Sequence, residues 1–178
     1  MLKRYEEFLK TVDERLNKYF EEQCEYIKCK EGCSACCEIG EYPFSRLELE
    51  YLLSGYSQLS VQKKLKIRNE IIRLKRTKPK MHKCPFLIDK KCSVYKYRGL
   101  VCRIHGLAWY DETENRVRLP YCTNTGLNYA KVFDRKTGEV FLQNPIKERL
   151  RIDTILDSEE AQKYNLERGE IRPLLKWF

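Results

Sequence analysis

Apolar and charged residues alternate with a helical period over the first 28 positions of the chain. The apolar positions recur at steps of three and four, with Lys, Arg, Glu and Asp between them. This pattern predicts an amphipathic helix over residues 1–28, whose apolar face packs on the rest of the domain. The stripe consists of Leu2, Tyr5, Leu9, Val12, Leu16, Tyr19, Phe20 and Ile27.

Two more helices are predicted in the first half of the chain. The sequence Ser-Arg-Leu-Glu at 45–48 is a capping box, in which the serine side chain accepts a backbone N–H and the glutamate returns a bond. Gly55 is placed to end that helix. The next helix is expected over residues 61–76, with Ser57 or Ser60 as its N-cap.

The second half begins with short apolar runs between turn residues, which is typical of hairpins. A helical spacing returns after Pro145 and continues through Leu156, and Ser158 is placed to cap one further short helix. Residues 171–178 are apolar enough to dock, and we expect them against the N-terminal helix. Residues 84–88 and 92–95 are expected as a short hairpin or a pair of extended segments, and the other expected pairs are 106–110 with 116–119 and 131–134 with 139–143.

Length and composition agree with one small domain. The chain has 178 residues, of which 42% are hydrophobic, enough to build a single core. No apolar run approaches the roughly 18 residues of a membrane helix. The N-terminus lacks the apolar segment of a signal peptide. We therefore expect a cytoplasmic protein without membrane contact, and an irregular α+β domain over residues 1–178, helical at both ends.

The chain contains nine cysteines. A reducing compartment keeps thiols out of disulfides, so clustered cysteines in such a protein are typical of metal ligands. The alternatives are a secreted disulfide scaffold, which an odd count disfavours, and cysteines scattered through a core. Metal binding is the favoured interpretation, and metal would then organise the loops in the middle of the chain.

The positive charge of the chain is only weak evidence for nucleic-acid binding. The formal charge of +9 would fall to about +5 if eight thiolates held two divalent metals. The most basic segment, residues 63–76, is then expected to be a solvated helix face. Metal ions are thus the predicted partners, nucleic acid is not expected, and a protein partner is left open.

The cysteines form two groups, spaced Cys-x3-Cys-x2-Cys-Cys and Cys-x7-Cys-x9-Cys-x19-Cys. A Cys-x2-Cys turn lets two sulfurs converge on one metal, whereas adjacent cysteines on a helix or strand point in different directions. This favours two metals, or a cluster with several corners. Cys24 lies on the helical stripe and is expected to be a buried packing residue. The remaining candidate ligands are Cys29, Cys33, Cys36, Cys37, Cys84, Cys92, Cys102 and Cys122.

Two stretches of this pattern resemble the YkgJ-type cysteine-cluster family, which is described as chelating zinc or iron. Residues 29–37 are similar to the family's Cys-x2-Cys-x2-Cys-Cys opening, which a capped acidic helix follows. Residues 84–103, from Cys-Pro-Phe-Leu to Cys-Arg, are similar to its second signature. The resemblance implies a metal-binding core at about residues 29–122, which carries all eight candidate ligands.

The chain departs from the family pattern in two places. The first spacing has three residues instead of two, which makes Cys29 the least secure ligand. Gly99 stands where the family has a proline, which is expected to loosen the turn before Cys102. One branch of the family reaches the flagellin lysine N-methylases, thought to carry an iron–sulfur centre. The resemblance implies no settled reaction for a stand-alone member.

The spacing Cys29-x3-Cys33-x2-Cys36 also occurs in radical S-adenosylmethionine enzymes. Those motifs usually place an aromatic residue before the third cysteine, where this chain has Ala35. They also need alternating strands and helices, and the predicted elements do not alternate in that way. The sequence therefore disfavours this class of enzyme.

Four residues near Cys102 are candidates for the shell around the ligands. Arg98 and Arg103 would offset thiolate charge or bind an anion. His105 is expected to pack or hydrogen-bond beside the cluster, with a ligand role as the alternative. Tyr95 is expected to pack against the cluster.

Three hypotheses remain from the sequence. The first is a metal-binding protein that holds an iron–sulfur cluster of the [4Fe-4S] type or zinc, in one or two centres, with no reaction assigned. The second is an iron–sulfur enzyme acting in redox chemistry or protein modification. The third is a zinc-stabilised nucleic-acid module. Thiolate binds zinc and iron alike, so the sequence does not choose between the metals.

Overall fold

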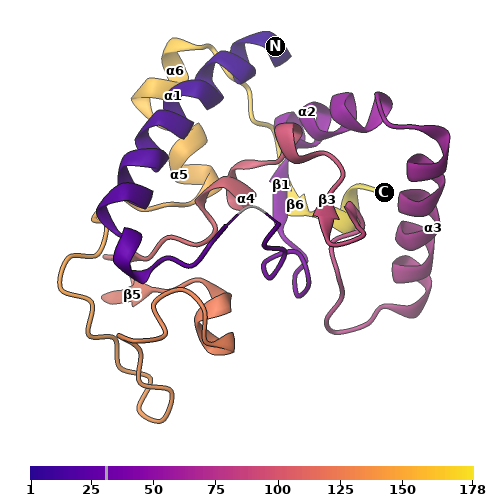
Figure 1. Cartoon of the computed structure of the whole chain (residues 1–178). Coiled ribbons are helices and arrows are strands. Elements are labelled where there is room, and N and C mark those ends of the chain that lie inside the picture. Colours follow the sequence, from indigo (N-terminus) through magenta and orange to yellow (C-terminus); the bar gives the residue numbers. More distant parts are fainter. Residues whose placement is uncertain (31) are drawn as a thin grey trace.

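The computed structural model describes all of the 178 residues except Glu31. In Figure 1, helix α1 (Leu2–Glu22) lies beside α5 (Ile152–Leu156) and α6 (Glu159–Lys163), while α3 (Val61–Thr77) stands at the opposite edge of the molecule. Short antiparallel strand pairs lie in the middle and along one side. These elements confirm the predicted α+β class. In the described part of the chain, no helix combines the length and the apolar character needed to cross a membrane.

Helix α1 is shorter than the sequence predicts. It ends at Glu22, and the chain continues in a 3-10 turn, η1 (Cys24–Tyr26). The predicted end near residue 28 is wrong: the N–H groups of Tyr26 and Ile27 form 3-10 bonds to Gln23 and Cys24, and the N–H of Lys28 donates to Asn128 Oδ1 (2.8 Å). The apolar stripe itself is confirmed, since Tyr5, Phe8, Leu9, Val12 and Leu16 are buried in a core shared with α5 and α6.

Helix α2 (Arg46–Ser57) begins as the capping box predicts. The Oγ atom of Ser45 accepts from the N–H of Glu48 (3.2 Å), and Oε2 of Glu48 accepts from the N–H of Ser45 (2.8 Å). Gly55 does not end the helix. It is buried, and a Cβ atom there would lie 2.3 Å from the ring of Tyr97, so the glycine allows close packing.

The carboxylate of Glu48 also fixes the start of α4 (Leu100–Ile104). Its Oε1 atom accepts from the N–H of Leu100 (2.7 Å), and burial raises the pKa of this carboxyl group. The backbone of Gly99 lies so close that a Cβ atom would come within 2.6 Å of the ring of Phe44. The predicted loosening at Gly99 is therefore wrong, because its backbone is packed against a neighbouring ring.

We expect Glu48→Gln to lower the free energy of unfolding by about 2 kcal/mol. Glutamine offers one acceptor oxygen and turns an NH2 group toward the second buried N–H, which is left unpaired. Urea unfolding of the variant and of the wild type measures the effect. Glu50→Gln, on the exposed side of α2, is the matched control and should change stability by less than about 0.5 kcal/mol. Equal effects of the two substitutions would contradict this account.

Helix α3 carries a second core on its inner side. Ser60 is its N-cap, accepting from the N–H of Lys63 (3.4 Å), so the second of the two predicted caps is confirmed. Its basic side chains lie away from the core, mostly on the exposed face. The buried residues Ile67 and Ile71 pack in one cluster with Phe44, Leu49, Leu52, Phe86, Val94 and Leu174.

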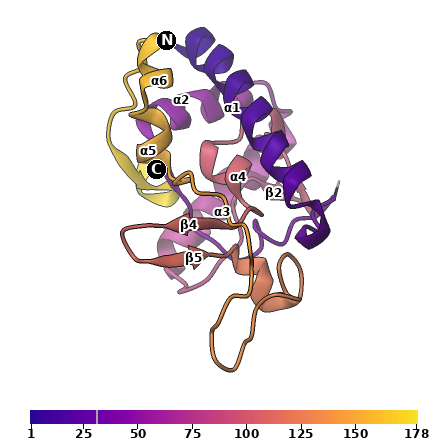
Figure 2. The ribbon, with the colours of Figure 1, turned by 90° about the vertical axis from the view of Figure 1, so that its left-hand side faces the viewer.

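Two predicted hairpins are confirmed, and a third predicted pair is reduced to a single bridge. Between 131–134 and 139–143, the structure has one isolated antiparallel bridge, from Phe133 to Val140. Figure 2 shows the second hairpin, β4–β5, below α5. The hairpins are β2 (Leu87–Ile88) with β3 (Lys91–Cys92), and β4 (Trp109–Asp111) with β5 (Arg116–Arg118).

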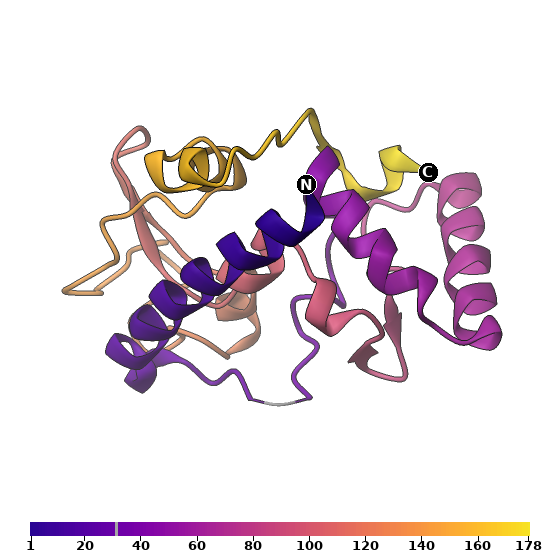
Figure 3. The same cartoon turned by 90° about the horizontal axis from the view of Figure 1, so that it is seen from above.

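The C-terminal residues pair with a strand that the sequence does not reveal. Strand β6 (Ile171–Pro173) lies antiparallel to β1 (Pro43–Ser45), and the following 3-10 turn η4 (Leu174–Trp177) packs on the second core. Figure 3 shows the C-terminus next to α3. The predicted docking of residues 171–178 on the N-terminal helix is wrong, because pairing with β1 carries them to the other core.

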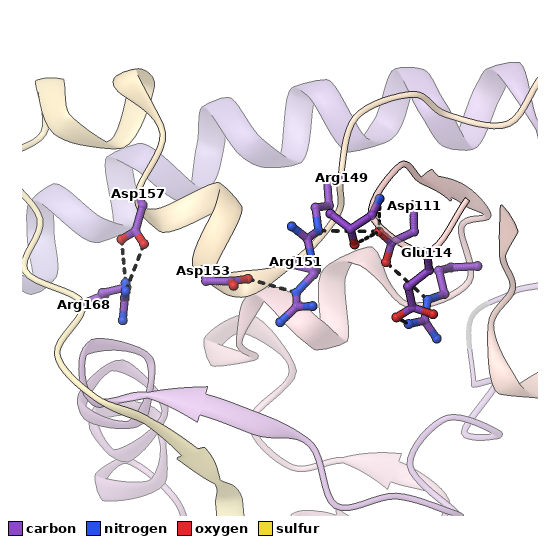
Figure 4. A network of polar contacts seen from close by, with 9 residues as sticks. Asp111, Glu114, Arg149, Arg151, Asp153, Asp157 and Arg168 are labelled. Atoms are coloured by element: carbon purple, nitrogen blue, oxygen red, sulfur yellow. Dashed lines mark hydrogen bonds and ion pairs between the residues drawn. The ribbon is translucent and has the colours of Figure 1, made fainter. Parts of the chain in front are cut away.

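The segment after Pro145 is extended before it becomes helical. Ile146 forms a parallel bridge with Trp109, which takes the place of the first turn of the predicted helix. Arg149 then approaches the buried carboxylate of Asp111, at 4.0 Å (Figure 4). Helix α5 starts only after this contact. Ser158 caps α6 as predicted.

Candidate metal centre

The candidate ligands lie on short elements in the middle of the fold. Cys92 is in β3 and Cys102 is in α4, both of which Figure 1 places between α1 and α3. Cys84 lies just before β2, and Cys122 is in the 3-10 helix η3 (Tyr121–Thr125). The other four follow η1 in the loop that leads to β1. Residues far apart in the sequence are thus carried toward one region of the molecule.

Five cysteines form what we call the inner group: Cys36, Cys37, Cys84, Cys92 and Cys102. The loop and the hairpin are joined directly, since the N–H of Cys84 donates to the carbonyl of Cys37 (2.8 Å). The pKa of Cys84 is raised to about 12, mainly by burial and in part by nearby charge on Cys92 and Cys36. Burial also raises the pKa of Cys102, which has Cys84, Cys92 and Cys36 as charged neighbours.

Cys36 and Cys37 converge instead of pointing apart. Their sulfurs are 3.9 Å apart, because residues 34–38 form a turn and the rule for helices and strands does not apply. A hydrogen bond from the Cys37 thiol lowers the pKa of Cys36 to about 7, and the charge of Arg98 acts in the same direction. Donating that bond raises the pKa of Cys37. The Cys36 thiol is therefore more readily ionised than the Cys37 thiol.

Backbone amides are directed at two sulfurs of the hairpin. The N–H groups of Phe86 and Leu87 donate to Cys84, and the N–H of Val94 donates to Cys92. These bonds lower the pKa of each thiol, opposing the effect of burial. Amides that donate to sulfur stabilise the thiolate, which is the form that binds metal.

Three cysteines form what we call the outer group: Cys29, Cys33 and Cys122. Burial raises the pKa of Cys122, and charge on Cys29, Cys33 and Cys36 adds to this effect. The side chain of Asn128 donates to the sulfur of Cys29 (3.2 Å). Cys29 and Cys33 are exposed residues, whereas Cys122 is buried. Cys36, a member of the inner group, is also a charged neighbour of Cys29 and Cys122 in the outer group.

The structure does not assemble a finished site. Among the residues that it describes, no three Cys, His, Asp or Glu side chains stand in an arrangement that holds a metal ion. The sulfurs of each group nevertheless lie close enough for their charges to interact. The donor set fits a thiophilic metal, because zinc and iron–sulfur clusters are both held by thiolates with amide donors around them.

Cys24 lies outside both groups, and it is exposed rather than buried. The predicted burial is wrong because α1 ends before this residue, and η1 turns its side chain away from the apolar stripe. We still expect Cys24→Ser to leave the metal content unchanged and to cost at most about 1 kcal/mol of stability. Metal analysis of the purified variant checks this. A metal content as low as that of Cys33→Ser would show that Cys24 is a ligand.

The four residues predicted around the ligands have different surroundings. The charge of Arg98 contributes to the lowered pKa of Cys36, and at Cys92 it opposes the rise in pKa that burial causes. Its guanidinium also lies 4.0 Å above the ring of Tyr95, which is 62% exposed. The part that these two residues play around a metal stays a prediction.

Arg103 and His105 lie deeper in the fold. Arg103 pairs with Asp13 of α1 and donates to the carbonyl of Lys96 (3.2 Å), so it joins α4 to α1. His105 packs edge-on against Tyr42, with ring centroids 5.6 Å apart. Its Nε2 atom is buried and has no hydrogen-bond partner in the described part of the chain. Burial lowers its pKa.

Comparison with known proteins identifies a family of chelating domains. The family model CxxCxxCC, described as "Putative zinc- or iron-chelating domain", matches residues 28–123. That range covers more than half of the chain and contains both the inner and the outer group. No curated protein and no solved structure matches the chain.

Proposed function

Because the chain belongs to the CxxCxxCC family of chelating domains, we propose that it is a metal-binding protein whose eight grouped thiolates hold two neighbouring metal centres. One observation carries the proposal. Of nine cysteines, the fold gathers eight into two electrostatically coupled groups and leaves Cys24 outside them. Uncompensated thiols are costly to bury and ionise together, whereas a divalent metal removes that cost.

The inner centre is proposed to use Cys37, Cys84, Cys92 and Cys102. Burial raises the pKa of Cys84, Cys92 and Cys102, all three of which pack on the second core, and the hydrogen bond with Cys36 raises the pKa of Cys37. A buried centre with four protein ligands is typical of structural metal sites. Its metal would therefore hold the loop, the hairpin and α4 together.

The outer centre is proposed to use Cys29, Cys33, Cys36 and Cys122. The Cys33-x2-Cys36 step suits a turn in which two sulfurs reach one metal. Charge on Cys36 contributes to the raised pKa values of Cys29 and Cys122. Since Cys36 is in contact with Cys37, the two centres would be neighbours.

Zinc and iron–sulfur iron are the two candidate metals, because thiolate ligands suit both. All nine cysteines are free, which supports our proposal of a reducing, cytoplasmic setting. Nothing in the proposal requires a reaction catalysed by the protein.

Anaerobic purification followed by elemental analysis tests the proposal. The expected result is either a colourless protein with about two zinc ions per chain, or a brown protein with iron and acid-labile sulfide in equal amounts. A metal-free protein that takes up neither zinc nor iron on anaerobic reconstitution would overturn it.

A further inference from the structure

The outer group differs from the inner group in its access to solvent. Cys29 and Cys33 are exposed, whereas none of the five cysteines of the inner group is. A chelating molecule or a second protein can therefore approach two of the outer sulfurs without unfolding the chain. Metal held by exposed ligands exchanges through such encounters, whereas buried ligands must first be uncovered.

Asn128 is the side chain that ties the outer group together. It is 1% exposed, and its Nδ2 atom donates both to the Cys29 sulfur (3.2 Å) and to the carbonyl of Gly106 (2.9 Å). Its backbone N–H donates to the sulfur of Cys122. One residue thus contacts two sulfurs that are 93 positions apart in the sequence.

The orientation of this amide is fixed by its neighbours. The N–H of Lys28 donates to Oδ1 (2.8 Å), so the oxygen must face Lys28 and the NH2 group must face the sulfur. Gly106 leaves room for the contact, since a Cβ atom there would lie 3.1 Å from the Cys29 sulfur and 3.2 Å from Nδ2. The chain on both sides of Asn128 is held as well, by bonds from Leu127 to Cys122 (3.1 Å) and from Tyr129 to Tyr26 (2.9 Å).

We propose that the outer centre is the exchangeable metal site of this protein, and that Asn128 is the positioning residue that sets how fast it releases metal. The inference rests on the proposed function and extends it to a residue beyond the matched range of 28–123. An N–H donor to a thiolate offsets its negative charge and fixes its direction. Removal of such an outer partner typically weakens a metal site by about 10–100-fold.

Transfer of zinc to a coloured chelator measures release from each centre. The metal-free protein is loaded with Zn²⁺ alone under anaerobic conditions and mixed with the chelator. The wild type is expected to release zinc in two phases of similar size, the fast one from the outer centre. Asn128→Asp, which replaces the NH2 group with oxygen, should speed the fast phase by about 10–100-fold and leave the slow phase unchanged.

A spectroscopic readout distinguishes an effect of Asn128 on the metal-binding sulfurs from a general effect on folding. With Co²⁺ in place of zinc, thiolate-to-metal charge-transfer absorption reports the electron density on the sulfurs. Asn128→Asp and Asn128→Ala should both shift this absorption, since both remove the donor and the second adds no charge. If the Asp variant fails to fold, the Ala variant decides. Asn124→Asp, an exposed asparagine in the same segment, is the matched control and should change neither readout.

The outcomes distinguish the two proposals. Two phases in the wild type, with unchanged rates and absorption in both Asn128 variants, would overturn the role of Asn128. A single phase that releases two zinc ions per chain would overturn the difference in exchange between the centres, and uptake of only one zinc ion would overturn the two-centre arrangement. Absence of zinc uptake would overturn metal binding itself.

Discussion

Removal of the bound metal is expected to lower the melting temperature of the protein by about 10–20 °C. The loop at 33–38, the β2–β3 hairpin, α4 and η3 all carry candidate ligands, so a metal bound there would cross-link elements that are far apart in the sequence. If the two centres supply about 5 kcal/mol of the folding free energy, a chain of this size loses roughly that many degrees. Thermal unfolding with and without a chelator measures the shift.

Limited proteolysis shows where the structure loosens. Trypsin should cut the metal-free protein first at Lys30 and Lys83, in the segments that lead to the two groups. Helix α1, whose apolar face is buried in the core shared with α5 and α6, should resist for longer. Reloading with metal should restore both the melting temperature and the resistance. A metal-free protein with unchanged stability would contradict a structural role for the metal.

Substitution of Cys102 is expected to do more damage than substitution of Cys29. Cys102 is in the inner group, and its thiol has a raised pKa because of its burial. Cys102→Ser should remove the inner metal and reduce stability by about 3–5 kcal/mol, since a four-thiolate centre without one ligand must admit water or reorganise. Cys29→Ser should remove only the outer metal and cost about 1 kcal/mol.

Paired metal analysis and urea unfolding check this difference. Each variant should keep about half of the wild-type metal, but only Cys102→Ser should lose much stability. Cys24→Ser serves as the matched control for a change from sulfur to oxygen at an exposed position. Complete loss of metal from both variants would indicate a single shared centre instead of two.

Local chemistry in the sequence predicts the helix starts well. Ser45 and Glu48 form their capping box because the bonds involve residues only three apart. Ser60 and Ser158 cap their helices for the same reason. The hairpin between Ile88 and Lys91 follows from two adjacent turn residues with short apolar runs on each side. Short-range interactions of this kind leave a pattern that can be read directly.

Long-range contacts decide what the sequence does not predict. The segment after α1 leaves the helix, and its Lys28 N–H bonds to Asn128, one hundred positions further along the chain. Strands β1 and β6 pair across a similar distance, with three residues each and no alternation long enough to mark a strand. Gly99 lies tightly against Phe44 because α2 and α4 meet there. None of these contacts has a local signal.

The candidate site, too, is only partly predictable from the sequence. The ligand residues stand out because nine cysteines with characteristic spacings are rare in an ordinary core. Their division into two groups depends on the fold, since Cys122 approaches Cys29 only after α4 and the following hairpin are placed. Asn128 has no signal at all, because an asparagine six residues after the last cysteine is typical of any loop. Its role is visible only from its contacts with two sulfurs.

X-ray absorption at the edge of the bound metal identifies its ligand atoms, and so tests whether eight thiolates and no other side chains hold the metal in two four-ligand centres. We expect a first shell of four sulfurs per metal at about 2.3 Å, with no nitrogen or oxygen at about 2.0 Å. A shell that contains nitrogen or oxygen would contradict it, and would indicate His105 or a carboxylate as a ligand in place of one of the eight cysteines.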